Sequence, residues 1–225
     1  MSEMTRSIGL FTALLLMAAT ASAEWSLDYG SASAISMEFA RTRSGWSAAG
    51  VARTTRYSEL GASYYEIYGS LTAGLHGGYL DLSQQDNPAT VGLMLGGYYV
   101  GVSAQSGRAL APSTELLWRL SYTYRNASDE TTQQITELEW HDWNASLAVS
   151  YRLNNTELSA GAMADVIEGD ETASGSVSHT RSFRHDRTGS GTFAIKYWVD
   201  DTGSIRLNLA GGARREAQLV FAREF

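Results

Sequence analysis

The chain of 225 residues contains no cysteine, two prolines and a single lysine, Lys196. Without cysteine no disulfide can form, so an exported chain of this size depends on a packed core or on a closed hydrogen-bonded sheet. The arginines are scattered along the chain, and the formal net charge is -7. With no single basic stripe, the sequence lacks the electrostatic footprint of a nucleic-acid-binding protein.

The N-terminus has the order of a secretory signal peptide. Arg6 precedes an apolar run over residues 8–19, and Ala21-Ser22-Ala23 follows it as a cleavage site of small residues. The run is shorter than the roughly 20 apolar residues of a membrane-spanning helix. We therefore expect residues 1–23 to be removed before Glu24, and residues 24–225 to form one domain.

Beyond Glu24, the recurring pattern has period two. In residues 116–125 the even positions are Leu, Trp, Leu, Tyr and Tyr, while the odd positions from Arg119 onward are polar. Such alternation gives a strand one apolar and one polar face. The pattern returns in residues 35–39, 143–153 and 205–209. The sequence therefore predicts an all-β protein.

Alternation fits either a soluble sandwich or a membrane barrel, because the apolar face turns to a core in the first and to lipid in the second. Aromatic residues at the ends of the apolar faces favour lipid, since amphipathic rings form girdles at membrane interfaces. These residues are Tyr122, Tyr124, Trp143, Tyr151 and Tyr197. We therefore predict a closed antiparallel up-and-down transmembrane β-barrel with a polar lumen.

The closing stretch, residues 217–225, resembles the C-terminal strand of bacterial outer-membrane barrels, which ends in an aromatic read by the barrel-assembly machinery. Phe221 and Phe225 would carry this assembly signal, although Arg223 stands where the class usually has an apolar residue. The sequence is similar to the class of OmpA-type, OmpW-type and Opa-type barrels and matches no single family. The resemblance implies the Gram-negative outer membrane as the location. It also implies outer-membrane lipid, lipopolysaccharide and the assembly machinery as partners.

Turn-forming residues at 153–156 and 200–203 predict tight turns, and the polar segments 83–90, 126–135 and 167–190 predict longer outer loops. An even strand number is expected when both ends of a closed barrel lie in the periplasm. Eight strands after an irregular N-terminal segment are the alternative, because residues 48–52 are poorly patterned. The favoured ten strands lie near 33–43, 46–57, 63–80, 91–104, 114–126, 137–153, 157–166, 190–199, 204–213 and 216–225.

The parity of these strands predicts a charged lumen containing both signs. A barrel of about eight to ten strands leaves an interior that side chains nearly fill, so ion-paired groups would form a plug. A narrow channel for ions or small solutes is the alternative. The predicted inward residues are Glu38, Glu66, His76, Glu115, Arg119, Arg125, Asp142, Arg152, Asp165, Lys196 and Arg206.

A hydrolase acting on lipid A or phospholipid is a further alternative, because His141 and Asp142 could join His179, Ser182 and His185 at an outer rim. Alternation, however, places His141 and Asp142 on opposite faces of their strand. We therefore assign no catalytic residue, metal ligand or cofactor. The leading hypothesis is a structural or surface-interaction barrel with a plugged lumen.

Overall fold

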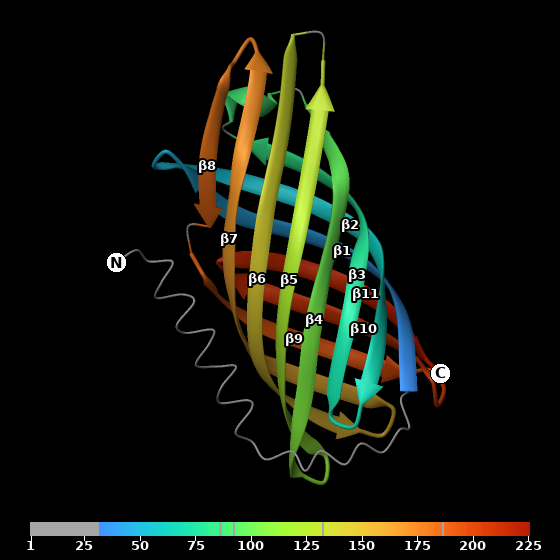
Figure 1. Ribbon diagram of the computed structural model, residues 1–225. Coiled ribbons are helices and arrows are strands. Elements are labelled where there is room, and N and C mark those ends of the chain that lie inside the picture. Colours follow the sequence, from blue (N-terminus) through green and yellow to red (C-terminus); the bar gives the residue numbers. More distant parts are fainter. Residues whose placement is uncertain (1–31, 86, 92, 132, 186) are drawn as a thin grey trace. The chain divides into compact units, whose positions relative to one another are not determined.

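The computed structural model describes residues 32–225 except 86, 92, 132 and 186, so the predicted signal peptide lies outside the described residues. The described residues form one antiparallel sheet and a short 3-10 helix, η1 (Figure 1). No helix in this part of the chain is long and apolar enough to cross a membrane. The elements are β1 (Ala32–Ala48), β2 (Val51–Tyr68), β3 (Leu71–Gln85), η1 (Pro88–Thr90), β4 (Leu95–Ala111), β5 (Thr114–Glu130), β6 (Gln134–Leu153), β7 (Thr156–Gly175), β8 (His179–His185), β9 (Gly189–Trp198), β10 (Gly203–Gly212) and β11 (Arg214–Glu224).

The sheet closes on itself. β1 pairs with β11, and β7 pairs directly with β9, so ten strands form one continuous ring without β8. The predicted all-β, up-and-down barrel is confirmed. We call the end at which β1 begins and β11 finishes the terminal end, and the other the opposite end.

β8 forms a second, smaller closure at the opposite end. It pairs with β7 over residues 168–173 and with β1 over residues 46–48, so β1 to β8 form a ring of eight strands there. The predicted outer loop 167–190 is therefore wrong, because residues 167–175 extend β7 and residues 179–185 form β8. Ile167 and Phe183 explain the extension, since both side chains are buried inside the barrel.

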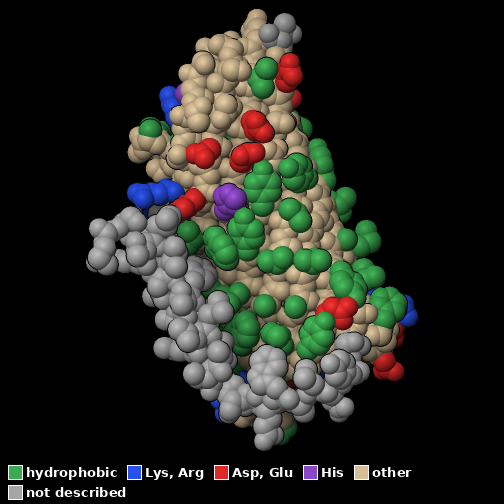
Figure 2. Space-filling model, viewed as in Figure 1, with side chains coloured by type: hydrophobic (Ala, Val, Ile, Leu, Met, Phe, Trp, Pro, Cys, Tyr) green, Lys and Arg blue, Asp and Glu red, His purple; other side chains and the backbone are tan. Residues whose placement is uncertain are grey.

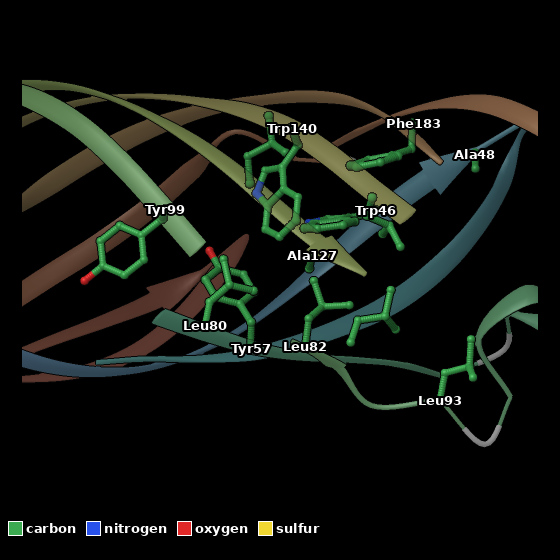
Figure 3. Packing of buried hydrophobic residues seen from close by; sticks show 13 residues of the cluster. Trp46, Ala48, Tyr57, Leu80, Leu82, Leu93, Tyr99, Ala127, Trp140 and Phe183 are labelled. Atoms are coloured by element: carbon green, nitrogen blue, oxygen red, sulfur yellow. The ribbon is translucent and has the colours of Figure 1, made fainter. Parts of the chain in front are cut away.

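Buried apolar side chains fill the lumen toward the opposite end (Figure 3). Trp46 stacks on Phe183 with ring centroids 4.6 Å apart, and Trp140 meets Trp46 edge-on at 5.2 Å. We call this cluster the apolar cap. Its members are Trp46, Ala48, Tyr57, Leu80, Leu82, Leu93, Leu95, Tyr99, Ala127, Leu138, Trp140, Ile167 and Phe183.

Two predicted turns in the first part of the chain are wrong. β1 continues to Ala48 and β2 to Tyr68, so the turns lie at Ala49-Gly50 and Gly69-Ser70 and not near 44–45 and 58–62. Ala49 and Gly50 adopt the positive φ angles of 51° and 80° that a tight hairpin requires. On β1 the inward residues Trp46 and Ala48 are apolar members of the cap, so the polar-inward alternation reverses there and imitates a strand end near 44–45.

The outward face of the ring carries a broad apolar band. Met37, Leu75 and Leu147 are 61%, 62% and 53% exposed, as expected of side chains that meet lipid. Figure 2 shows hydrophobic side chains gathered over the lower part of the viewed face. Several acidic side chains lie above this hydrophobic region. The predicted turns at the terminal end are confirmed: Asn154 has a φ of 53°, and Asp200 accepts backbone hydrogen bonds from Thr202 and Gly203.

Candidate functional site: the barrel lumen

Buried ion pairs cross the lumen between the apolar cap and the terminal end. Arg125 donates to Glu59 over 2.6 Å and to Asp142 over 3.0 Å. Arg214 lies 3.1 Å from Asp142, 3.4 Å from Asp165 and 2.5 Å from Glu216. We call these six residues the ion layer.

The ion layer is nearly inaccessible to solvent. The side chains of Arg125 and Asp142 are 5% and 4% exposed. A buried charge is tolerated only when it is paired and hydrogen-bonded, and each arginine here serves at least two carboxylates. Guanidinium groups suit this role because their donors reach several acceptors at once.

Hydrogen bonds from neutral side chains continue the network toward the terminal end. Tyr99 donates to Glu38 over 3.2 Å, and Gln218 donates to the other oxygen of Glu38 over 2.8 Å. His76 Nε2 lies 2.9 Å from the hydroxyl of Thr123. These hydrogen bonds link β1 to β4 and β11, and β3 to β5, across the inside of the barrel.

Three residues of the ion layer are not among the predicted lumen residues. Glu59 falls in the predicted turn 58–62, and Arg214 falls between two predicted strands. Glu216 lies within the last predicted strand, on the same parity as Arg214, but was not selected. Extending the alternation of β2 and β11 by a few residues would have found all three.

A cavity of about 530 Å³ lies on the terminal side of the ion layer. Arg125, Asp142 and Arg214 line its closed side. Its lining also includes Ser70, from the β2–β3 turn, and Glu115, which is exposed at the start of β5, so the cavity reaches the terminal end.

The structure places the predicted lumen residues as follows. Glu38, His76, Glu115, Arg119, Arg125, Asp142 and Arg206 line the cavity, and Asp165 joins the ion layer. Arg152 and Lys196 lie over the ring of Trp198 at the terminal end, at 5.3 and 3.4 Å from its centroid.

Glu66 does not belong to the lumen, so its prediction is wrong. It accepts a hydrogen bond from Tyr64, an exposed side chain two residues away on the same outward face. The prediction placed residues 66 and 76 on one strand, so their shared parity put both in the lumen. The turn at Gly69-Ser70 separates them: inward positions are odd on β2 and even on β3.

A second buried polar group lies beyond the apolar cap at the opposite end. Glu171, 1% exposed, accepts hydrogen bonds from Arg53 over 2.9 Å and Asn87 over 2.6 Å, and its other oxygen lies 2.6 Å from His179. These contacts tie β7 to β2, β8 and the segment before η1.

The candidate hydrolase residues do not converge. His141 contacts Tyr122 over 2.7 Å on the outward face, while Asp142 points inward to the ion layer. Ser182 donates to Asp170, whereas His179 lies against Glu171. Among residues 32–225 as described, no group of three or more histidine and acidic side chains is placed to hold a metal ion.

No protein-family model matches the sequence, and no curated protein matches it in sequence. Solved structures do match in fold. The translocator domain of the autotransporter NalP from Neisseria meningitidis has a TM-score of 0.52 and 12% identity over 100% of this chain and 98% of that one. The outer membrane protease OmpT from Escherichia coli has a TM-score of 0.50 and 9% identity over 91% and 97% of the two chains.

Neisserial surface protein A (NspA) matches with a TM-score of 0.43 and 13% identity, over 86% of this chain and 99% of that one. At such identities the likeness concerns the fold alone. The likeness to the NalP and OmpT structures, together with the closed ring and the apolar outward band, shows that this chain has the fold of the outer-membrane β-barrels.

Proposed function

We propose that this protein is an integral barrel of the Gram-negative outer membrane that does not conduct and serves a structural or surface-interaction role. The observation that carries the proposal is that two groups of buried side chains lie one after the other along the lumen. The ion layer fills it at the level of Arg125 and Arg214, and the apolar cap fills it again toward the opposite end. Solutes in the cavity therefore meet a charged barrier and then a dry one.

The orientation follows from the class. In bacterial barrels the two chain ends and the short turns face the periplasm. The terminal end therefore lies in the periplasm, and β8 with the outer half of β7 projects from the cell. Export depends on the signal peptide at residues 1–23, and N-terminal sequencing of membrane-extracted protein should find Glu24 first. Met1 at the start of the inserted protein would contradict this step.

Single-channel recording in planar lipid bilayers tests the closed lumen. The folded protein should show no unitary conductance. The double variant Trp140→Ala with Arg125→Ala removes a large side chain from each barrier, so it should conduct, while each single variant retains one intact barrier. Stable, ohmic openings of the unaltered protein would contradict the proposal.

A narrow channel is the second candidate, and the cavity of about 530 Å³ that reaches the terminal end favours it. Conduction would then require the cap to move, and β8 is the short strand that closes it. Ser47 and Arg184 face each other across the β1–β8 pair, and the chain has no cysteine of its own. If the protein is a gated channel, a Ser47→Cys, Arg184→Cys disulfide should abolish openings that a reductant restores.

A further inference from the structure

Four arginines form a cluster on the outward face of β1, β2 and β11. Arg43 on β1 lies directly opposite Arg56 on β2 and directly opposite Arg215 on β11. Arg41 is the next outward residue along β1. Directly opposite side chains have Cβ atoms about 4.5–5.5 Å apart, so three guanidinium groups stand in a row across three strands. We call these four residues the arginine patch.

The patch has no neutralising partner within the described residues. No ion pair or hydrogen bond within the described residues joins its four side chains to another protein group, whereas Arg125 and Arg214 each pair with carboxylates in the lumen. Asp81 on β3, diagonal to Arg56 in the register, accepts a hydrogen bond from Tyr79. Like charges directly opposite each other destabilise a sheet. The four like charges therefore offer a site for an anionic ligand.

A hollow of about 440 Å³ lies within the patch, which contributes Arg41, Arg43, Arg56 and Arg215 to its lining. Small residues, Gly211 and Ala217, line it beside them. Nothing lies within 4 Å of the position that a Cβ at Gly211 would take. The hollow can therefore admit a headgroup between the arginines.

The position of the patch indicates a membrane-anchored ligand. The next outward residues toward the terminal end are Phe39 on β1 and Leu209 on β10, with Leu60 two outward positions beyond Arg56, and they are 50%, 41% and 56% exposed. The patch thus borders the edge of the apolar band. On β6 and β7 the same edge is acidic, with Glu139 directly opposite Asp170, so the basic character is local.

We infer that the arginine patch binds the phosphate groups of a bisphosphorylated lipid of the lipid A class, with its acyl chains against Phe39, Leu60 and Leu209. Each phosphate monoester carries about −1.5 to −2 charge at neutral pH, so two of them balance the four arginines. Guanidinium groups bind phosphate through paired, charge-assisted hydrogen bonds. The inference deepens the proposed function and rests on its membrane placement.

The test uses the folded protein in a neutral detergent, with native mass spectrometry to count bound lipid. The probes are bisphosphorylated lipid A, its monophosphorylated form and phosphatidylcholine. Binding should be strongest for the bisphosphorylated lipid and should weaken as salt screens the exposed charges. The triple variant Arg43→Gln, Arg56→Gln, Arg215→Gln should bind it at least about tenfold more weakly, which corresponds to about 1.4 kcal/mol.

Two further variants separate charge from site. Arg108→Gln, Arg181→Gln, Arg223→Gln removes the same charge from exposed positions outside the patch and should leave lipid binding unchanged. Gly211→Leu fills the hollow without changing charge and should weaken binding. An equal loss in both triple variants would overturn the inference, because the effect would then follow net charge. Full competition by inorganic pyrophosphate at an equal concentration would also overturn it, because the acyl chains would then contribute nothing.

Insertion into phosphatidylcholine vesicles, measured first, keeps the two proposals distinguishable. A protein that inserts and remains closed, yet binds lipid A no better than phosphatidylcholine, overturns this inference and leaves the proposed function standing. A protein that does not insert overturns both.

Discussion

Arg125 on β5 lies 2.6 Å from Glu59 on β2, which is not a neighbouring strand, so their ion pair spans the lumen. The same guanidinium lies 3.0 Å from Asp142 on β6. The contact both fills the interior and ties separated parts of the ring. Removing the Arg125 side chain should therefore lower the free energy of unfolding more than it lowers the amount of inserted protein.

Replacing Arg125 with Met leaves the Glu59 carboxylate buried without its partner. Breaking a buried ion pair from one side costs about 3–5 kcal/mol, and we expect a loss of this size in the free energy of unfolding, measured by urea in lipid vesicles. Glu59→Gln should restore much of the loss. Glu115→Gln is the control, because this carboxylate is exposed at the mouth of the cavity. Equal stability of Arg125→Met and the control would show that the ion layer does not stabilise the barrel.

Trp140 tests the apolar cap. Its side chain is fully buried against Trp46 and Tyr57, and Trp140→Ala should lower the free energy of unfolding by about 3–5 kcal/mol, as for other large core truncations. Trp143→Ala, three residues along the same strand, is the matched control because Trp143 is 49% exposed on the outward face. The same urea titration should give a clearly smaller loss for this control. The reverse order would mean that the cap is not a packed core.

Much of the fold was predictable because period-two alternation is strong wherever one face meets lipid. The strands near 114–126, 190–199 and 204–213 were found to within a few residues, and the ring of ten strands was expected. The prediction failed where the polarity of the lumen reverses. At Trp46 an inward residue becomes apolar, and a sequence pattern cannot distinguish this reversal from a change of strand.

The charged character of the lumen was predictable, but the pairing of its ionised side chains was not. Parity selected Arg125, Asp142 and Asp165, because these positions fall within the predicted strands 114–126, 137–153 and 157–166. It could not select Arg214, because the strand boundary there was placed two residues late. Cross-lumen partners such as Arg125 and Glu59 depend on the stagger between strands, which the alternation of a single strand does not encode.

Asp200 gives a pH-dependent prediction at the terminal end. Hydrogen bonds from the backbone of Thr202 and Gly203 and from the Thr202 hydroxyl lower the pKa of Asp200 below its usual value. A carboxyl with a lowered folded pKa adds stability above its unfolded pKa of about 3.9 and loses it as the pH falls through the folded pKa. Asp200→Asn should therefore unfold more easily at pH 7, and its difference from the unaltered protein should shrink as the pH falls below about 3.9. Asp201→Asn is the control, and a stability difference that does not change with pH would contradict this origin.

Phe225 and Phe221 test assembly. Phe221 lies on the outward face of β11 and is 50% exposed, and Phe225 follows the end of β11 and is 69% exposed. Both rings are therefore accessible, as an assembly signal must be. Deleting Phe225 should lower the amount of heat-modifiable barrel in outer-membrane fractions and leave protein in the periplasm. Phe221→Ala with the deletion should be worse than either change. Normal levels of the doubly altered protein would mean that these aromatics are not the signal.

Leu120 and Ser121 test which face of the barrel meets lipid. Ser121 lines the cavity, and Leu120 is the next residue along β5, so its side chain points to the other face. A charge placed on the lipid face at mid-membrane costs about 2–4 kcal/mol. Leu120→Arg should therefore lower the free energy of unfolding in bilayers by about this amount, measured by urea titration of the vesicle-inserted protein. Ser121→Ala should cost far less.

Ser121→Arg is the matched control, because it introduces the same side chain one residue away. The cavity beside Ser121 has room for it and already contains the carboxylates of Glu38 and Glu157. The control should therefore keep nearly the stability of the unaltered protein, while Leu120→Arg is less stable. If instead Leu120→Arg were harmless and Ser121→Arg destabilising, the apolar face of β5 would not be in lipid. The outward apolar band would then not be the surface that the membrane covers.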